Sequence, residues 1–162
     1  MSETTMFRIE DDGSTTEIAC LHNPFRYAMM VWVALCDRYT PGKTPFDADW
    51  WQVIDIEMQR AQAPACDILT LRVTFDSWAT RGADHLRKVA TAFRDFDVRH
   101  WPQGHAQHGK SHLPAMADEF DRQASADAYG VCIWTTSTTD NPWEDYNFHE
   151  QNDHVWVEAG VG

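Results

Sequence analysis

Basic residues are missing from the last quarter of this chain. Arg122 is the last of them, and the forty residues that follow carry seven acidic groups and no Lys or Arg. The whole chain has a net charge of −12, and only the stretch from Arg81 to His112 is net basic. Nonspecific affinity for nucleic acid comes from Lys and Arg that displace counterions from phosphates, so this balance argues against direct nucleic-acid binding.

Long apolar runs and paired cysteines are also lacking. The longest apolar run, Tyr27–Cys36, has ten residues, about half of the ~20 that a membrane-spanning helix needs. The four cysteines include no CxxC pair, which is the usual pattern of a zinc ribbon or a redox dithiol. The first residues lack the basic and apolar regions of a signal peptide. We therefore expect a cytoplasmic protein with no membrane partner, and we interpret Cys20, Cys36 and Cys132 as buried, inert thiols.

Length and composition predict one compact domain over residues 1–162. Apolar residues make up 43% of the chain and aromatic residues 12%, including eight Trp, so a packed core is available. A chain of this length is too short for two domains of ordinary size.

The N-terminal third predicts a hairpin and a helix. Phe7 and Ile9 alternate with polar residues, 11–14 supplies turn chemistry, and 17–21 resumes an apolar run. Asn23 followed by Pro24 is a helix start, and this helix should run to about Tyr39.

Residues 50–59 fit two structures. A helical stripe runs from Phe46 through Trp50, Ile54 and Met58, but Ile54, Ile56 and Met58 also alternate with polar residues. The next run, 69–75, alternates in the same way, with Leu, Leu, Val and Phe separated by Thr, Arg and Thr. Two period-2 segments joined by a loop favour an antiparallel pair of strands.

The C-terminal half predicts helices from Ala83 and over about 114–123, a buried strand over 130–136, a polar loop, and a last strand over 155–157. The expected fold is α+β, with a mostly antiparallel sheet of about six strands in the order β-β-α-β-β-α-α-β-β and helices packed on it.

One loop matches the phosphate-binding pattern GxxxxGK[ST] through Gly104, Gly109, Lys110 and Ser111. In such a loop, backbone amides surround phosphate oxygens, the Lys reaches the β- and γ-phosphates, and the Ser binds magnesium. The context is unfavourable, because the loop should follow a buried parallel strand. The same loop carries His105, His108 and His112, whose neutral imidazoles suit zinc, copper or nickel. A nucleotide- or metal-binding enzyme built on this loop is therefore the alternative function.

The C-terminal acidic segment is the stronger candidate site. Residues 140–153 interleave five carboxylates with aromatic rings, a composition that is typical of a protein-binding surface, although the rings could equally fold back on the sheet. The predicted contact residues are Asp140, Trp143, Glu144, Asp145, Tyr146, Glu150 and Asp153.

These features favour a binding protein over an enzyme, and they require no cofactor. The sequence contains no GxSxG nucleophile motif, and no residue set commits it to a reaction. We expect a small acidic inhibitor or immunity-type protein that occludes a basic, nucleic-acid-handling protein such as a nuclease by presenting carboxylates in place of phosphates. Phage anti-defence proteins of the anti-CRISPR kind belong to this physical type, and the comparison is one of type and not of motif.

Overall fold

The computed structural model describes residues 3–22, 26–75, 79–104, 109–136, 141–150 and 156. Within these ranges the chain forms five helices and one four-stranded antiparallel sheet with the strand order β2-β1-β4-β3. The elements in chain order are β1 (Glu3–Ile9), β2 (Thr15–His22), α1 (Ala28–Tyr39), α2 (Trp50–Arg60), α3 (Ala65–Thr74), β3 (Ala79–Arg81), α4 (Ala83–Gly104), α5 (Leu113–Ser125) and β4 (Gly130–Thr136).

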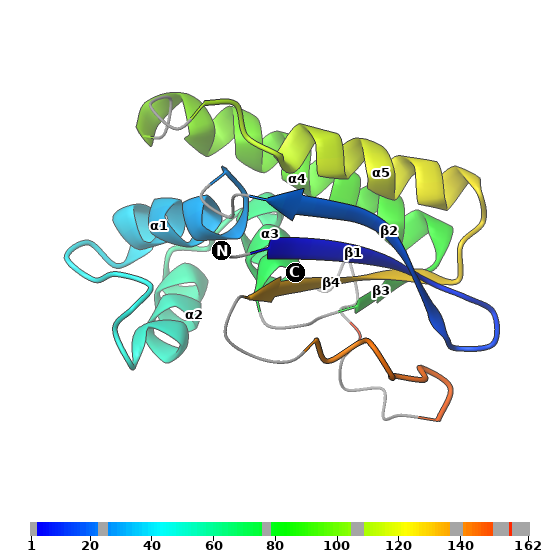
Figure 1. Cartoon of the computed structure of the whole chain (residues 1–162). Coiled ribbons are helices and arrows are strands. Elements are labelled where there is room, and N and C mark those ends of the chain that lie inside the picture. The colour runs from blue at the N-terminus through cyan, green and yellow to red at the C-terminus, as the bar shows by residue number, and fades with distance from the viewer. Residues whose placement is uncertain are drawn as a thin grey trace.

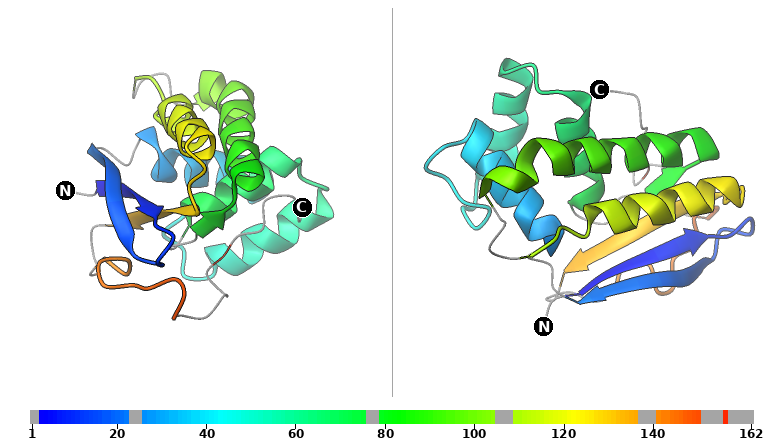
Figure 2. Two further views of the ribbon diagram at one scale, coloured as in Figure 1. Left: turned by 90° about the vertical axis from the view of Figure 1, so that its right-hand side faces the viewer. Right: turned by 90° about the horizontal axis from the view of Figure 1, so that it is seen from above.

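The helices and the segment 141–150 lie on opposite faces of the sheet. Helices α4 and α5 run side by side over one face, and α1 and α2 lie beyond one end of it (Figure 1). The segment 141–150, coloured orange, crosses the other face (Figure 2). Among the described helices, none combines the length and the apolar composition needed to cross a bilayer.

Two cores follow from the alternation of side chains along the strands. On β1, Met6 points to the helices, while the odd-numbered Phe7 and Ile9 point to the other face. The larger core fills the space between the sheet and the helices. The second core is smaller and consists of Phe7, Ile9, Ala79, Cys132, Trp143, Phe148 and Trp156.

The structure confirms the predicted elements whose apolar residues fit only one spacing, either that of a helix or that of a strand. The hairpin forms with its turn over 11–14, and β4 spans 130–136 as predicted. The two amphipathic helices are present as α4 and α5. Their apolar stripes explain the agreement: Leu86, Val89 and Phe93 on α4 and Phe120 on α5 are all fully buried.

The predicted strand over 50–59 is wrong, because this segment is helix α2. Its buried side chains are Trp50, Ile54 and Met58, which recur every four residues, whereas Ile56 is 50% exposed. The alternation that favoured a strand is therefore accidental, and the helical stripe that fitted the same residues is the structure that forms.

The predicted strand over 69–75 is also wrong, because residues 69–74 belong to helix α3 and Phe75 is its C-cap. A strand would have turned Thr70 and Thr74 toward water, but both are buried. Their hydroxyls are satisfied in the interior: Thr74 Oγ1 donates to the Thr70 carbonyl at 2.8 Å and accepts from Trp32 Nε1 at 3.2 Å. Because threonine is polar, these two residues make the sequence look like an alternation of buried and exposed positions. Their hydrogen bonds allow them to be buried in a helix instead.

One helix start and two strands complete the comparison with the prediction. Helix α1 begins at Ala28 with Tyr27 as its N-cap, and the predicted start at 23–24 lies outside the described residues. The short strand β3 was not predicted. Of the predicted last strand, only Trp156 is described, and it forms a single parallel bridge with Ala79. The described sheet thus has four strands in place of about six.

Candidate functional site

The turn between β1 and β2 is held by its own aspartate. Asp12 Oδ1 accepts hydrogen bonds from the Ser14 amide at 2.9 Å and from the Ser14 hydroxyl at 2.5 Å. These bonds stabilise the ionised form, so the Ser14 hydroxyl and amide lower the pKa of the Asp12 carboxyl. This end of the hairpin therefore carries fixed negative charge.

Segment 141–150 is docked on that turn. The Phe148 amide donates to the Gly13 carbonyl at 2.8 Å, the His149 ring bonds the Asp11 carbonyl, and Thr15 Oγ1 donates to the Trp143 carbonyl at 3.1 Å. The contact requires glycine at position 13, where φ is +85° and an added Cβ would lie 2.8 Å from the His149 amide nitrogen.

The aromatic side chains of this segment fold back on the sheet. Trp143 is 1% exposed and Phe148 is 4% exposed, and Trp143 Nε1 donates to the Ile133 carbonyl at 3.1 Å. Tyr146 is half-buried with its ring edge-on to Trp143, at a centroid distance of 4.9 Å. Trp143, predicted as a contact residue for a partner, is thus buried in the second core in this structure.

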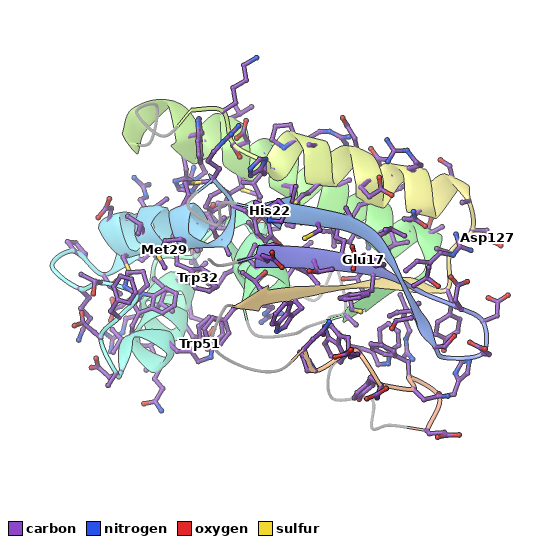
Figure 3. The ribbon with its side chains drawn as sticks, in the orientation of Figure 1. Glu17, His22, Met29, Trp32, Trp51 and Asp127 are labelled. Carbon is purple, nitrogen blue, oxygen red and sulfur yellow. The ribbon has the colours of Figure 1, made fainter. Side chains whose placement is uncertain are left out.

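The carboxylates between these rings point outward. We call the exposed set Asp11, Asp12, Asp127, Glu144, Asp145 and Glu150 the acidic end. The hydrogen bonds described above join segment 141–150 to the β1–β2 turn, and the ring of Tyr129 contacts His149 edge-on at a centroid distance of 5.1 Å. Figure 3 shows Asp127 at the same end of the sheet. Asp140 and Asp153 lie outside the described residues.

The acidic residues of α5 do not extend this surface. Arg94 of α4 binds Asp118 and Asp121 at 2.7 Å each, and Arg122 pairs with Glu119. Their charges are therefore compensated within the helical layer.

The loop with the phosphate-binding pattern lacks the required context. It follows α4, which ends at Gly104, and a phosphate-binding loop follows a strand. Lys110 is exposed, and its carbonyl accepts a hydrogen bond from Arg26 Nε at 2.6 Å. Ser111 Oγ accepts from the Leu113 amide at 2.9 Å at the start of α5. Ser111 thus lies just before His112, the N-cap residue of α5, and its hydroxyl bonds to the first residue of that helix.

Of the three predicted metal-binding histidines, only His112 is described. Its Nε2 is buried and has no hydrogen-bond partner among the described residues. Burial, and then the nearby Arg26 charge, lower the pKa of His112, which keeps the ring neutral. His105 and His108 lie outside the described residues, so the predicted site cannot be built from them here.

A buried polar cluster that the sequence did not reveal joins α1, α3 and α4. Asp67 is fully buried and accepts hydrogen bonds from Tyr39 Oη at 2.5 Å and from His100 Nε2 at 2.8 Å, with Arg99 Nε at 3.4 Å. Burial alone would raise the pKa of Asp67, but the bonds from His100 and Tyr39 outweigh it and lower the pKa. Burial and the Asp67 carboxylate raise the pKa of Tyr39 to about 12.

This cluster has the side chains of a catalytic site but the chemistry of a structural one. The one adjacent thiol is Cys66, whose Sγ lies 3.6 Å from Asp67 Oδ1. Burial and the Asp67 charge raise the pKa of Cys66 to about 11, so the nucleophilic thiolate is scarce at neutral pH. The cluster therefore fixes three helices and offers no activated nucleophile.

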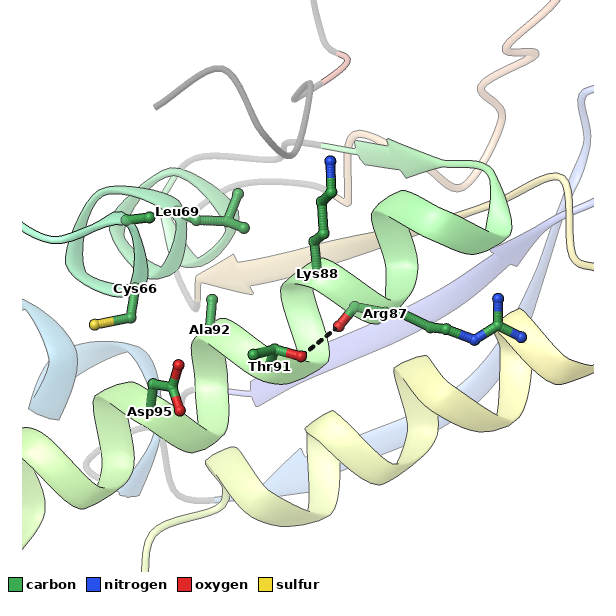
Figure 4. A pocket seen from close by; sticks show the side chains of 8 residues that line it. Cys66, Leu69, Arg87, Lys88, Thr91, Ala92 and Asp95 are labelled. Atoms are coloured by element: carbon green, nitrogen blue, oxygen red, sulfur yellow. Dashed lines mark hydrogen bonds between the residues drawn. The ribbon is translucent and has the colours of Figure 1, made fainter.

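A groove of about 320 Å³ lies between α3 and α4, with Cys66, Leu69 and Ala92 on its walls. Its polar groups do not converge: Figure 4 shows Arg87 and Lys88 extending in different directions, with Asp95 at the other end. A small-molecule site needs a few polar groups that point at one ligand, and this groove lacks that arrangement.

The expectation that Cys20 is buried is wrong. Cys36 and Cys132 are buried as predicted, but Cys20 is exposed on β2. It lies beside Glu3 and His22, and the donor atoms of the three side chains are all within 4.8 Å of one another. The sequence analysis missed this group.

No protein-family model, curated protein or solved structure matches this chain.

Proposed function

We propose that this chain is a small acidic binding protein whose acidic end docks on a basic surface of a protein partner. The single observation that carries the proposal is the convergence of carboxylates from the β1–β2 turn, the α5–β4 turn and segment 141–150 at one end of the sheet. Such a concentration of one charge steers encounter with the opposite charge and selects against other partners.

The acidic end is held rigid before it meets a partner. Trp143 and Phe148 fasten the segment to the second core, and the Gly13 carbonyl and the Asp11 carbonyl tie it to the hairpin turn. Because the carriers of the charge are already ordered, little conformational entropy is lost on docking.

The partner that best fits this surface is a nucleic-acid-handling protein, for example a nuclease, whose basic residues otherwise bind phosphates. Docked there, the carboxylates occupy the positions of phosphate groups and block the nucleic acid. Half-buried Tyr146 at the edge of the cluster supplies apolar contact area. Inhibition is then by occlusion and needs no catalytic residue or cofactor in this chain.

Charge reversal tests the proposal. Asp11, Glu144, Asp145 and Glu150 are changed together to Lys. A matched variant reverses four exposed carboxylates elsewhere, at Asp37, Asp55, Asp84 and Asp95, so both variants have the same net charge. Each protein is used to capture partners from lysate at low and high salt, and thermal melts verify folding.

We expect one captured protein to be lost with the first variant and kept with the second. Its capture should weaken as salt rises, and added duplex DNA should release it from the wild-type protein. Capture that is equal for all three proteins, or that falls equally with both variants, would refute a docking role for this surface.

A further inference from the structure

A β-bulge decides which way the side chains of β2 face. From the turn up to Phe7, the register pairs Ile9 with Thr15 and Phe7 with Glu17, but from Met6 onward Met6 pairs with Ala19. Ile18 is therefore an extra residue on β2. One extra residue exchanges the two faces for every residue that follows it in the strand.

The bulge places Cys20 and His22 on the face away from the helices. Thr5 pairs with Cys20 and Glu3 pairs with His22. The odd-numbered residues of β1 share the face of Phe7 and Ile9, which pack in the second core. An unbulged hairpin would continue the register of Ile9 and Phe7 and would pair Cys20 with Thr4, on the face that packs against α4 and α5. The register therefore gathers Glu3, Cys20 and His22 on one uncovered patch.

The three side chains meet at metal-ligand distances. His22 Nδ1 lies 3.3 Å from Glu3 Oε1, and the donor atoms of Glu3, Cys20 and His22 all lie within 4.8 Å of one another. Two ligands of a tetrahedral zinc ion are about 3.4 Å apart, given bonds of about 2.1 Å. The carboxylate and the imidazole already have this separation, and the thiol sulfur lies within 4.8 Å of both.

We propose that Glu3, Cys20 and His22 bind a zinc ion. The donor set is one carboxylate oxygen, one thiolate and one imidazole, which suits Zn²⁺ and excludes the hard ions Mg²⁺ and Ca²⁺, which take oxygen ligands. Thr5 Oγ1 lies 4.0 Å from Cys20 Sγ and donates toward it, so it can orient the ligand sulfur. The ladder between β1 and β2 fixes the backbone of all three ligands.

The fourth position of this site faces solvent. His22 is 71% and Glu3 41% exposed at the side chain, and Cys20 is exposed as well. Water completes the tetrahedron there, as it does in zinc sites with three protein ligands. The inference does not depend on the proposed docking function.

Cobalt substitution tests this site directly. Co²⁺ is added to the purified, reduced protein, and the near-ultraviolet band that arises from a thiolate bound to cobalt is recorded. Zinc is then titrated in, with a chromophoric chelator as competitor. The variants are Cys20→Ser and His22→Asn, and the matched thiol control is Cys66→Ser. A second control, with His105, His108 and His112 changed to Asn, removes the three histidines of the alternative metal site.

We expect one zinc per chain with a dissociation constant below about 10 μM. Zinc should displace cobalt, the thiolate band should be absent from Cys20→Ser, and His22→Asn should weaken zinc binding by at least about tenfold. Both controls should bind as the wild type does. Absence of binding in this range, a band that persists in Cys20→Ser, or binding that disappears only when the loop histidines are changed would overturn the proposal.

Discussion

Replacing Trp143 by Ala should destabilise the protein strongly, because its ring is a core element of the sheet's second face. The side chain is 1% exposed and contacts Tyr146 and Phe148, with ring centroids at 4.9 and 5.1 Å. A buried indole removes roughly 150–250 Å² from water, which corresponds to about 4–6 kcal/mol at about 25 cal/mol per Å². Losses for replacing a buried Phe or Trp by Ala are typically about 3–5 kcal/mol, and we expect about 4 kcal/mol here.

The assay is urea unfolding followed by far-ultraviolet circular dichroism. Typical domains have a free energy of unfolding of about 5–15 kcal/mol, so the variant should fold at 25 °C but unfold at a clearly lower urea concentration. Its melting temperature should fall by roughly 10 °C. Phe46→Ala is the control, because Phe46 is 79% exposed and its loss should change stability by less than about 0.5 kcal/mol.

The same variant separates two roles for this residue. If Trp143 were an exposed anchor for a partner, its removal would weaken binding and leave the free energy of unfolding almost unchanged. A loss of less than about 1 kcal/mol would therefore refute its assignment to the core. Trp143→Phe refines the measurement, since it keeps most of the ring contacts and removes only the donor to the Ile133 carbonyl.

Two further substitutions test the buried cluster and the hairpin contact. Asp67→Asn should lower the free energy of unfolding by about 3 kcal/mol at pH 7, because the buried Asp67 carboxylate accepts hydrogen bonds from both Tyr39 and His100. Asp55→Asn on the surface should change it by almost nothing. The pKa of Asp67 is lowered in the folded protein. Its contribution to the free energy of unfolding is therefore complete above the ordinary carboxyl pKa of about 4 and is lost as the pH falls through the folded pKa. In urea unfolding between pH 7 and pH 3, the stability of the variant should therefore decline less steeply than that of the wild type. Gly13→Ala should cost more than Gly42→Ala by about 1–3 kcal/mol in thermal melts, because both positions have positive φ but only the Gly13 Cβ would collide, with Asn147 and His149. Equal costs at the two glycines would contradict the docking of segment 141–150 on the turn.

The elements that were predicted correctly are those whose apolar residues repeat with the spacing of a helix or of a strand, but not with both. Helix α4 and strand β4 each bury residues at a single spacing, and local turn residues fix the hairpin. Segments 50–59 and 69–75 fit both periods, and tertiary contacts decide between them. For α3 the deciding contacts are the hydroxyls of Thr70 and Thr74, whose bonds to backbone carbonyls permit their burial. Such contacts cannot be inferred from hydrophobicity.

The candidate sites show the same limit. The carboxylates of segment 141–150 are exposed as their polarity predicts, but the inward direction of Trp143 depends on the open face of the sheet that it covers. Asp67 and His100 are 33 residues apart, and only the packing of α3 on α4 brings them together. The exposure of Cys20 depends on a bulge at Ile18, and no turn or breaker residue in the sequence marks that bulge.

The two proposed sites lie at opposite ends of β1 and can therefore be tested separately. Glu3 begins the strand and Ile9 ends it next to the acidic end, so the sites are about 20 Å apart at about 3.3 Å per residue. Perturbations at this separation without shared partners are close to additive. Charge reversal at Glu144 and Asp145 should thus leave the cobalt band intact, and Cys20→Ser should leave partner capture intact. If a variant at one site also changed the measurement made for the other site, that variant would have disturbed the sheet. Its result would then not count as evidence for either site.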